Sequence, residues 1–235
     1  MKLKFTLEVS DMMISPESYY EMNLKGKTAK QIMSAIRGLK NEIGHLKNVM
    51  EHPDYGSEPI MCPSESTRLW CTREYLERAK IALAEAGSVY KPSQSELKTI
   101  EFENNLSAIS KIVFTIGGYF GGYETREISL DCGDLQVNVQ HSLPIEPEET
   151  AVPYGKDEFM DELSRLHIGE WRGSYSPERF GYVVLDGTQW ELEIHYNNGA
   201  KPFKSHGTNS FPYNFNEFQE LLGIDTSTED NDENE

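Results

Sequence analysis

The residues best suited to chemistry in this sequence are its histidines, cysteines and carboxylates, and their spacing matches no familiar catalytic or metal-binding pattern. Cys62 and Cys71 stand nine positions apart, whereas a structural zinc site uses closely spaced pairs of ligands. The sequence contains no GxSxG nucleophile elbow. Glu191 and Glu193 share a face of a predicted strand, but solvated surface explains such a pair in an acidic chain better than general acid–base catalysis. We therefore expect no metal and no cofactor, and we assign no catalytic residue.

The glycine-rich segment at residues 117–122, GGYFGG, could in principle bind phosphate. Such loops work because backbone N–H groups at a helix N-terminus meet the anion. Here the glycines lie between two predicted strands, and no GK[ST] follows them. We predict a hairpin turn or bulge, with Tyr119, Phe120 and Tyr123 packed on the sheet.

The polar loop that follows residue 205 is the best candidate for contact with a ligand or partner, because its polar groups adjoin aromatic residues. Asn209 suits an Asx-type turn, and Asn214 suits a helix N-cap. Trp190 lies on the same strand face as Leu192 and Ile194 and should anchor the core. The candidate binding residues are His206, Thr208, Asn209, Tyr213 and the strand residue His195, which we expect to be exposed.

The same region carries a moderately specific string, DGTQWELEI at 186–194 followed by GTNSFPYNF at 207–215. It resembles a DGxxWxLEI hairpin followed by GxNx(Y/F)PxNF in uncharacterised bacterial proteins. The resemblance covers about residues 168–224. It implies a bacterial or phage origin and a small ββ(β)α unit, and it brings no activity or catalytic residue.

Charge and hydropathy limit the classes of function that this chain can have. Its 22 Lys+Arg against 39 Asp+Glu give a formal net charge of −17. This balance argues against nucleic acid as a partner, because phosphate binding needs clustered Lys and Arg. No apolar run approaches the length of about 20 residues that a membrane span needs. The odd number of cysteines favours reduced thiols. We expect a cytoplasmic protein without membrane contact.

The first part of the chain is expected to form one α+β domain over residues 1–143. Residues 2–9 alternate as a strand does. A capping box at Thr28 and Gln31 opens a helix of about 22 residues, and a second helix runs from about Ser64 to Ala86, ending at Gly87. The two helices predict an antiparallel hairpin. From Lys98 to Ser142 the period of two predicts an antiparallel meander of strands.

A Pro- and Glu-rich linker is predicted at residues 144–155. Beyond it we expect a small αβββα unit over residues 156–224. Its three strands are Phe180 to Leu185, Gln189 to Tyr196, and a short third strand to about Ser205, with turns at Asp186-Gly187 and Asn197-Asn198-Gly199. The acidic tail, residues 225–235, is expected to be disordered.

Three functional hypotheses remain open. The favoured one is a non-enzymatic interaction protein, such as an inhibitor, an immunity-type protein or an accessory subunit, whose acidic surface binds a basic protein partner. The second is an enzyme with a site assembled from His195, His206, Asp186 and Glu191. The third is an assembly module that uses the helical hairpin of residues 28–86.

Overall fold

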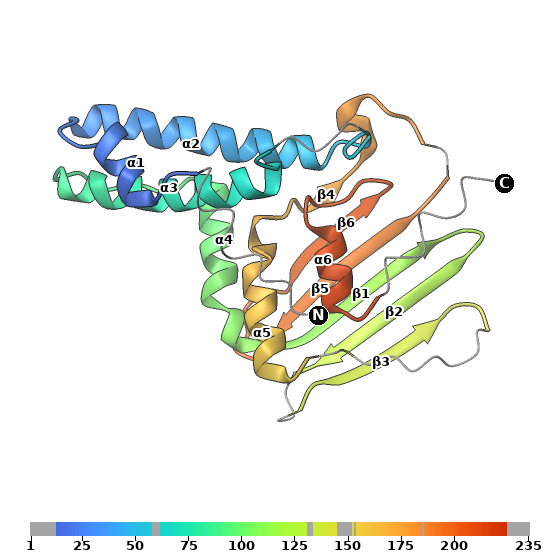
Figure 1. Cartoon of the computed structure of the whole chain (residues 1–235). Coiled ribbons are helices and arrows are strands. Elements are labelled where there is room, and N and C mark those ends of the chain that lie inside the picture. The colour runs from blue at the N-terminus through green and yellow to red at the C-terminus, as the bar shows by residue number, and fades with distance from the viewer. Residues whose placement is uncertain are drawn as a thin grey trace. The chain divides into compact units, whose positions relative to one another are not determined.

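The computed structural model describes residues 13–57, 62–130, 134–144, 152, 154–184 and 186–224, and Figure 1 shows the chain with its elements labelled. The chain divides into two compact units, Met1–Lys91 and Pro92–Glu235. The strand predicted at residues 2–9 and the tail at 225–235 lie outside the described residues.

The first unit is helical and contains α1 (Pro16–Asn23), α2 (Ala29–Met50) and α3 (Glu65–Glu85). The predicted hairpin of two long helices is confirmed, with its start signals. Thr28 and Gln31 form the capping box of α2, and Ser64 caps α3 by accepting a hydrogen bond from the Thr67 N–H. Gly87 follows α3 with a φ of 76°, the left-handed conformation that commonly ends a helix.

The three helices enclose a core of their own. Helix α1, which the sequence patterns do not predict, packs on α3 through the stacked rings of Tyr19 and Tyr75, whose centroids lie 4.5 Å apart. The Tyr75 hydroxyl also donates to the Ile14 carbonyl at 2.6 Å. The buried core residues are Leu24, Ile32, Ile36, Leu76, Ala79, Ala82 and Leu83.

The second unit contains a six-stranded mixed sheet in the order β3-β2-β1-β5-β6-β4. The strands are β1 (Ile109–Gly118), β2 (Gly122–Ser129), β3 (Gln136–His141), β4 (Ser174–Tyr175), β5 (Gln189–Tyr196) and β6 (Phe203–Thr208). All neighbours are antiparallel except β4 and β6, which are parallel. With the helices this makes an α+β fold, as predicted.

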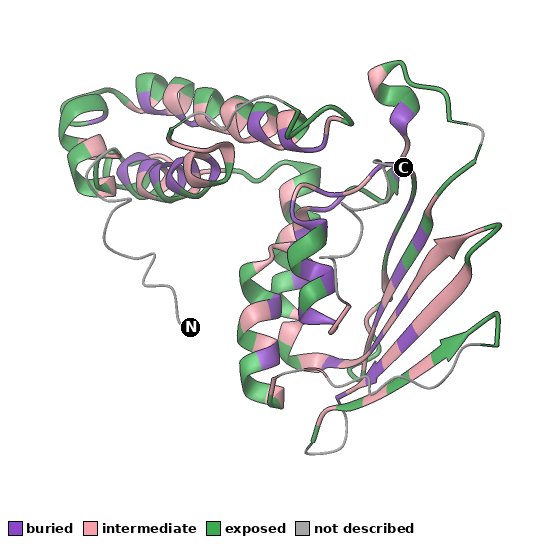
Figure 2. Cartoon of the chain, turned by 45° about the vertical axis from the view of Figure 1, so that its right-hand side comes forward, coloured by how far each residue is buried: buried purple, intermediate pink, exposed green. Residues whose placement is uncertain are grey.

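Helices cover one face of this sheet, as Figures 1 and 2 show. They are α4 (Gln94–Asn104), α5 (Lys156–Arg165) and α6 (Phe215–Leu221), with the 3-10 turns η2 (Leu106–Ala108), η3 (Ile168–Glu170) and η4 (Pro177–Phe180) between elements. Trp190 of β5 is buried in the core between the sheet and these helices, as predicted. The centroid of its ring lies 6.0 Å from that of Trp171 and 5.0 Å from that of Phe215.

Residues 98–102 form part of helix α4, so the strand predicted there is wrong. Ser93 and Glu96 make a reciprocal capping box, a local signal that the short alternation of Ile100 and Phe102 obscured. Phe102 is buried against the sheet while Ile100 is 39% exposed, which fits one face of a helix.

Residues 180–184 do not pair as a strand, so the predicted three-stranded meander is also wrong in its first member. Strand β5 pairs on one side with β1 and on the other with β6. A strand has two edges, so no edge of β5 remains for a hairpin partner. The Asn-Asn-Gly turn is confirmed, since residues 197–199 connect β5 to β6.

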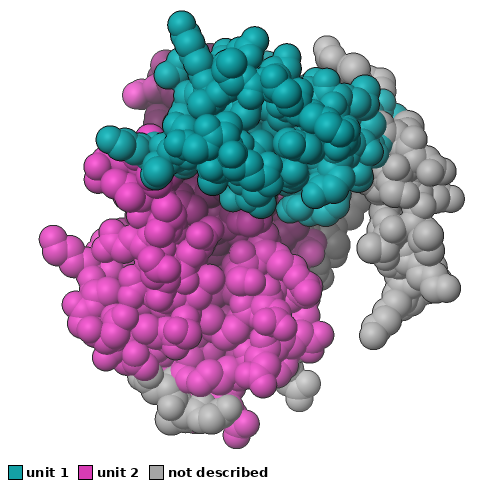
Figure 3. All heavy atoms as spheres, turned by 90° about the vertical axis from the view of Figure 1, so that its left-hand side faces the viewer, with its two compact units in different colours: residues 1–91 teal, residues 92–235 magenta. Residues whose placement is uncertain are grey.

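The compact units differ from the predicted domains, as the colouring of Figure 3 shows. The predicted boundary at 144–155 falls inside the second unit, because β1 pairs with β5 along most of its length, from Ile109 opposite Tyr196 to Gly117 opposite Gln189. Strands on both sides of the predicted linker therefore belong to one sheet. Most of that linker lies outside the described residues.

In the described part of the chain, no helix is both long and apolar enough to cross a membrane.

Candidate functional site

The sheet face opposite α4, α5 and α6, here called the open face, carries polar side chains. Strand alternation turns Trp190, Leu192 and Ile194 into the core and their neighbours to the opposite side. The β1–β5 and β5–β6 registers align these neighbours in rows. The open face includes Lys111, Thr115, Glu127, Gln189, Glu191, Glu193, His195, Lys204, His206 and Thr208.

A hollow of about 270 Å³ lies on this face where β1, β5 and β6 meet. Its side chains include Glu191 and His206, which stand opposite each other across the β5–β6 ladder. Thr115 of β1 adjoins Glu191 on the other side, and Tyr123 donates from its hydroxyl to Gln189 Oε1 at 3.3 Å. Its full lining is Thr115, Tyr123, Gln189, Trp190, Glu191, His206, Gly207 and Thr208.

The predicted binding residue His195 is on the open face but belongs to a separate ion cluster. Its Nε2 lies 3.2 Å from Glu193 Oε2, and Glu193 also accepts from Lys204. The hydrogen bond from Lys204 is the main cause that lowers the pKa of Glu193, with a smaller contribution from His195. His195 keeps 33% of its side chain exposed, so its predicted exposure is only partial.

Asn209 serves the fold and does not line the hollow. Its Oδ1 accepts from the Thr188 N–H at 2.7 Å, and its Nδ2 donates to the Asp186 carbonyl at 3.1 Å. Asn209 therefore links the turn before β5 to the end of β6, where it adopts a φ of 47°. In the same turn, Asp186 Oδ1 accepts a hydrogen bond from the Gly187 N–H at 2.8 Å. Tyr213 is half-buried and is also absent from the lining.

The four residues of the enzyme hypothesis therefore divide into three locations. Glu191 and His206 meet in the hollow, His195 lies in the ion cluster, and Asp186 lies in the turn. Within the described ranges, no hydroxyl or carboxylate hydrogen bonds to His206, so no preassembled nucleophile–base pair is present there. Among the same residues, no three His, Cys, Asp or Glu side chains are placed together to hold a metal ion.

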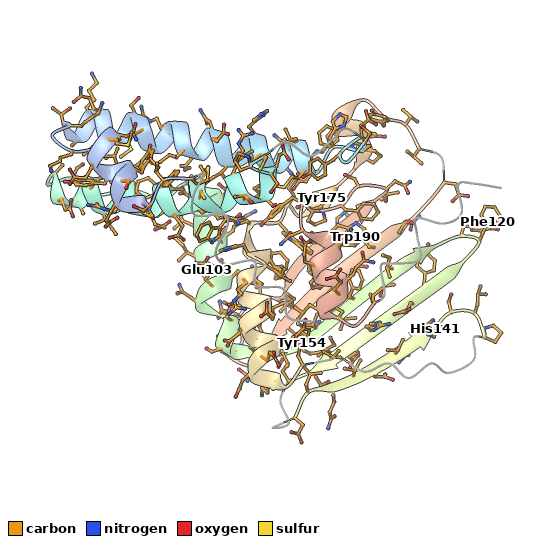
Figure 4. All side chains as sticks on the ribbon, in the orientation of Figure 1. Glu103, Phe120, His141, Tyr154, Tyr175 and Trp190 are labelled. Carbon is orange, nitrogen blue, oxygen red and sulfur yellow. The ribbon has the colours of Figure 1, made fainter. Side chains whose placement is uncertain are left out.

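The predicted hairpin turn at residues 117–122 is confirmed. β1 and β2 pair as far as Gly118 opposite Gly122, and Gly122 has a φ of 74°, the left-handed residue that follows a short hairpin loop. Tyr119 and Phe120 are 82% and 81% exposed, so their predicted packing on the sheet is wrong. Figure 4 shows Phe120 at the tip of the hairpin.

A second polar surface, not identified as a site in the sequence, lies on the outer side of the helices of this unit. We call it the acidic helical layer, and Figure 4 shows its member Glu103 on α4. Helical spacing places these acids opposite buried residues such as Phe159 and Leu163, a signal that was present in the sequence. Its exposed carboxylates are Glu101, Glu103, Asp157, Glu158, Asp161, Glu217 and Glu220.

Few cations lie among these carboxylates: α4 contains Lys98, α5 contains Lys156 and Arg165, and α6 contains neither Lys nor Arg. Lys98 is exposed and offsets one of the negative charges. Lys156 donates to the Leu130 carbonyl, and Arg165 is held by Glu162 of the same helix. The outer side of the helices is therefore strongly negative.

Tyr196 lies near Glu101 and makes the second unit sensitive to alkaline pH. Burial, with a smaller contribution from Glu101, raises the pKa of Tyr196 from 10.0 to about 12. An unfolded phenol ionises near pH 10, so Tyr196 contributes full stability below pH 10 and loses it as the pH rises toward 12. The full pKa difference corresponds to about 2.7 kcal/mol, and because Tyr196 is only half-buried the expected loss is smaller, about 1–2 kcal/mol. Urea unfolding at a series of alkaline pH values should show a shallower loss in Tyr196→Phe, whereas the exposed Tyr119→Phe should behave as wild type.

No family model matches the chain, and no curated protein or solved structure matches it either.

Proposed function

We propose that this protein is a non-enzymatic interaction protein that binds a basic protein partner through the acidic helical layer. The observation that carries the proposal is the concentration of exposed carboxylates on α4, α5 and α6 with few cations among them. Such a surface attracts and orients a basic partner at long range and accelerates association.

The distribution of charge along the chain supports the choice of this surface. Residues 1–91 contain 13 basic and 12 acidic residues, so their net charge is +1, whereas residues 92–235 contain 9 basic and 27 acidic residues, so the second unit carries a net charge of −18. Positive and negative charges are more evenly balanced on the open face of that unit. There Lys111 Nζ lies 3.5 Å from Glu127 Oε1, and Lys204 forms an ion pair with Glu193. The helical side therefore presents the more one-sided charge.

The test compares two triple variants with the same net charge. One changes a carboxylate on each helix of the layer, Glu103→Gln, Asp161→Asn and Glu220→Gln. The control changes three exposed carboxylates of the first unit, Glu21→Gln, Glu74→Gln and Glu77→Gln. Immobilised wild-type protein first captures the partner from a lysate of its own cells at low salt, and the purified partner is then titrated against each variant.

The layer variant should associate about tenfold more slowly than wild type at low ionic strength, and the control within about twofold. The difference should shrink as salt is added, because exposed charges are screened. Equal effects of the two triple variants would refute the assigned surface. A complex that is insensitive to salt, or a captured partner that is acidic, would refute the proposal itself.

A further inference from the structure

Strand β3 forms one edge of the six-stranded sheet, and no described residue pairs with its outer side. Its six residues, Gln136–His141, include no charged residue and no proline, and its register with β2 is free of bulges. Natural edge strands are commonly protected by charges, prolines or bulges, because free N–H and C=O groups invite pairing. A regular, uncharged edge of this kind is suited to receive another strand.

The direction of the backbone groups on β3 follows from its pairing with β2. The Ser142 N–H donates to the Tyr123 carbonyl at 2.8 Å, directly beyond the pair of Glu124 and His141. In an antiparallel ladder, alternate residues bond to the same neighbour. Residues 136, 138 and 140 therefore bond to β2. The residues whose N–H and C=O groups face the outer edge are Val137, Val139 and His141.

The sequence of this edge is the same in both directions. Residues 136–140 read Gln-Val-Asn-Val-Gln, centred on Asn138. When two copies are placed antiparallel about that centre, Val137 of each faces Val139 of the other. Both valines direct their backbone groups outward, so each such pair exchanges two N–H···O=C bonds.

We propose that β3 pairs with β3 of a second copy of this chain about a two-fold axis at Asn138, joining the two sheets into one. An interface of this kind is self-complementary, as a two-fold dimer requires. Amides then face amides on the open side, Asn138 opposite Asn138 and Gln136 opposite Gln140. On the other side, Val137, which is half-buried and packs against the core of the second unit, gains a valine neighbour.

The dimer should be reversible and should tighten with salt. A six-residue edge buries less than the roughly 1,200–2,000 Å² of a stable protein interface, so association depends on concentration. Each copy carries a formal charge of −17, and added salt screens the repulsion between the copies. Salt has the opposite effect on the complex with a basic partner, so the two proposals can fail independently.

Disulfide trapping tests the register. In a Cys62→Ser, Cys132→Ser background, Asn138→Cys should form a disulfide-linked dimer under mild oxidation. In the proposed register, residue 138 of one copy and residue 138 of the other form a non-hydrogen-bonded antiparallel pair. The Cα atoms of such a pair lie about 4.5 Å apart, within the range of a disulfide. The matched control is Gln136→Cys, which in this register lies about 13 Å from its own copy and should remain monomeric. The remaining Cys71 is only 3% exposed.

Sedimentation velocity tests the association without cross-linking. Asn138 is exposed, and Asn138→Lys places two cations opposite each other on the axis, which should raise the dissociation constant of the dimer by about tenfold or more. Asn197→Lys makes the same change in the exposed β5–β6 turn and should leave the constant unchanged. The proposal is overturned if wild-type protein stays monomeric at about 1 mM in about 0.5 M salt, or if Gln136→Cys cross-links as readily as Asn138→Cys.

Discussion

Replacement of Asn214 by alanine is expected to lower the free energy of unfolding of the second unit by about 3 kcal/mol. Asn214 is buried; its Oδ1 accepts from Trp171 Nε1 at 3.0 Å, and its Nδ2 donates to the Leu166 carbonyl at 2.6 Å. Alanine leaves that indole N–H and that carbonyl without their partner inside the core. An unsatisfied buried polar group costs about 1–3 kcal/mol, and here there are two.

The matched control for this prediction is Asn216→Ala on the same helix. Asn216 is exposed, so its replacement should change stability by less than about 0.5 kcal/mol. Urea unfolding is best followed by tryptophan fluorescence in a Trp70→Phe background, because the remaining tryptophans, Trp171 and Trp190, both report on the second unit. Equal midpoints for the two alanine variants would contradict a bridging role for Asn214.

Replacement of Gly207 by alanine is expected to destabilise the same unit by about 3 kcal/mol through overpacking. A Cβ at this position would lie 2.5 Å from Trp190 Nε1 and 2.6 Å from the Ser210 carbonyl oxygen. These two atoms form a hydrogen bond of 3.0 Å, so the added methyl group intrudes on that bond. To make room, either Trp190 must move or β6 must shift.

The control for Gly207→Ala is Gly173→Ala, because a Cβ at Gly173 would meet nothing within 4 Å. Urea unfolding should give a near wild-type midpoint for Gly173→Ala and a clearly lower one for Gly207→Ala. The fluorescence spectrum of the folded Gly207→Ala protein should also change, since the environment of Trp190 is disturbed. A wild-type midpoint for Gly207→Ala would contradict the predicted overpacking, because it would mean that Trp190 or β6 shifts without loss of stability.

Part of the candidate site was predictable because it depends on strand alternation. The period of two already placed Glu191 and Glu193 on the face opposite Trp190, and the structure places them on the open face. What alternation could not predict is the neighbour of each residue. Glu191 meets His206 and Thr115 because β5 lies between β6 and β1, and β1 precedes β5 by about 80 positions.

Asn209 and Asn214 show the same limit for single side chains. Local patterns predicted an Asx-type turn and an N-cap for them. Asn214 does occupy the N-cap position of α6, but its side chain makes no cap hydrogen bond and bridges Trp171 to Leu166 instead. Asn209 bonds across to residues 186 and 188. In both cases, packing brought distant hydrogen-bond partners near the side chain. These long-range bonds formed in place of the predicted cap and turn bonds.

The sequence by itself determined the features that neighbouring residues control: the capped helices α2 and α3, the glycine hairpin between β1 and β2, the Asn-Gly turn after β5, and the excess of acid in the second unit. Tertiary structure alone decided which strands pair, where the chain divides, and which helices bring their acidic faces together on one side of the sheet. The physical reason is that a cap or turn is formed within a few residues. A strand's two edges, by contrast, are filled by whichever distant segments complete the sheet and its core.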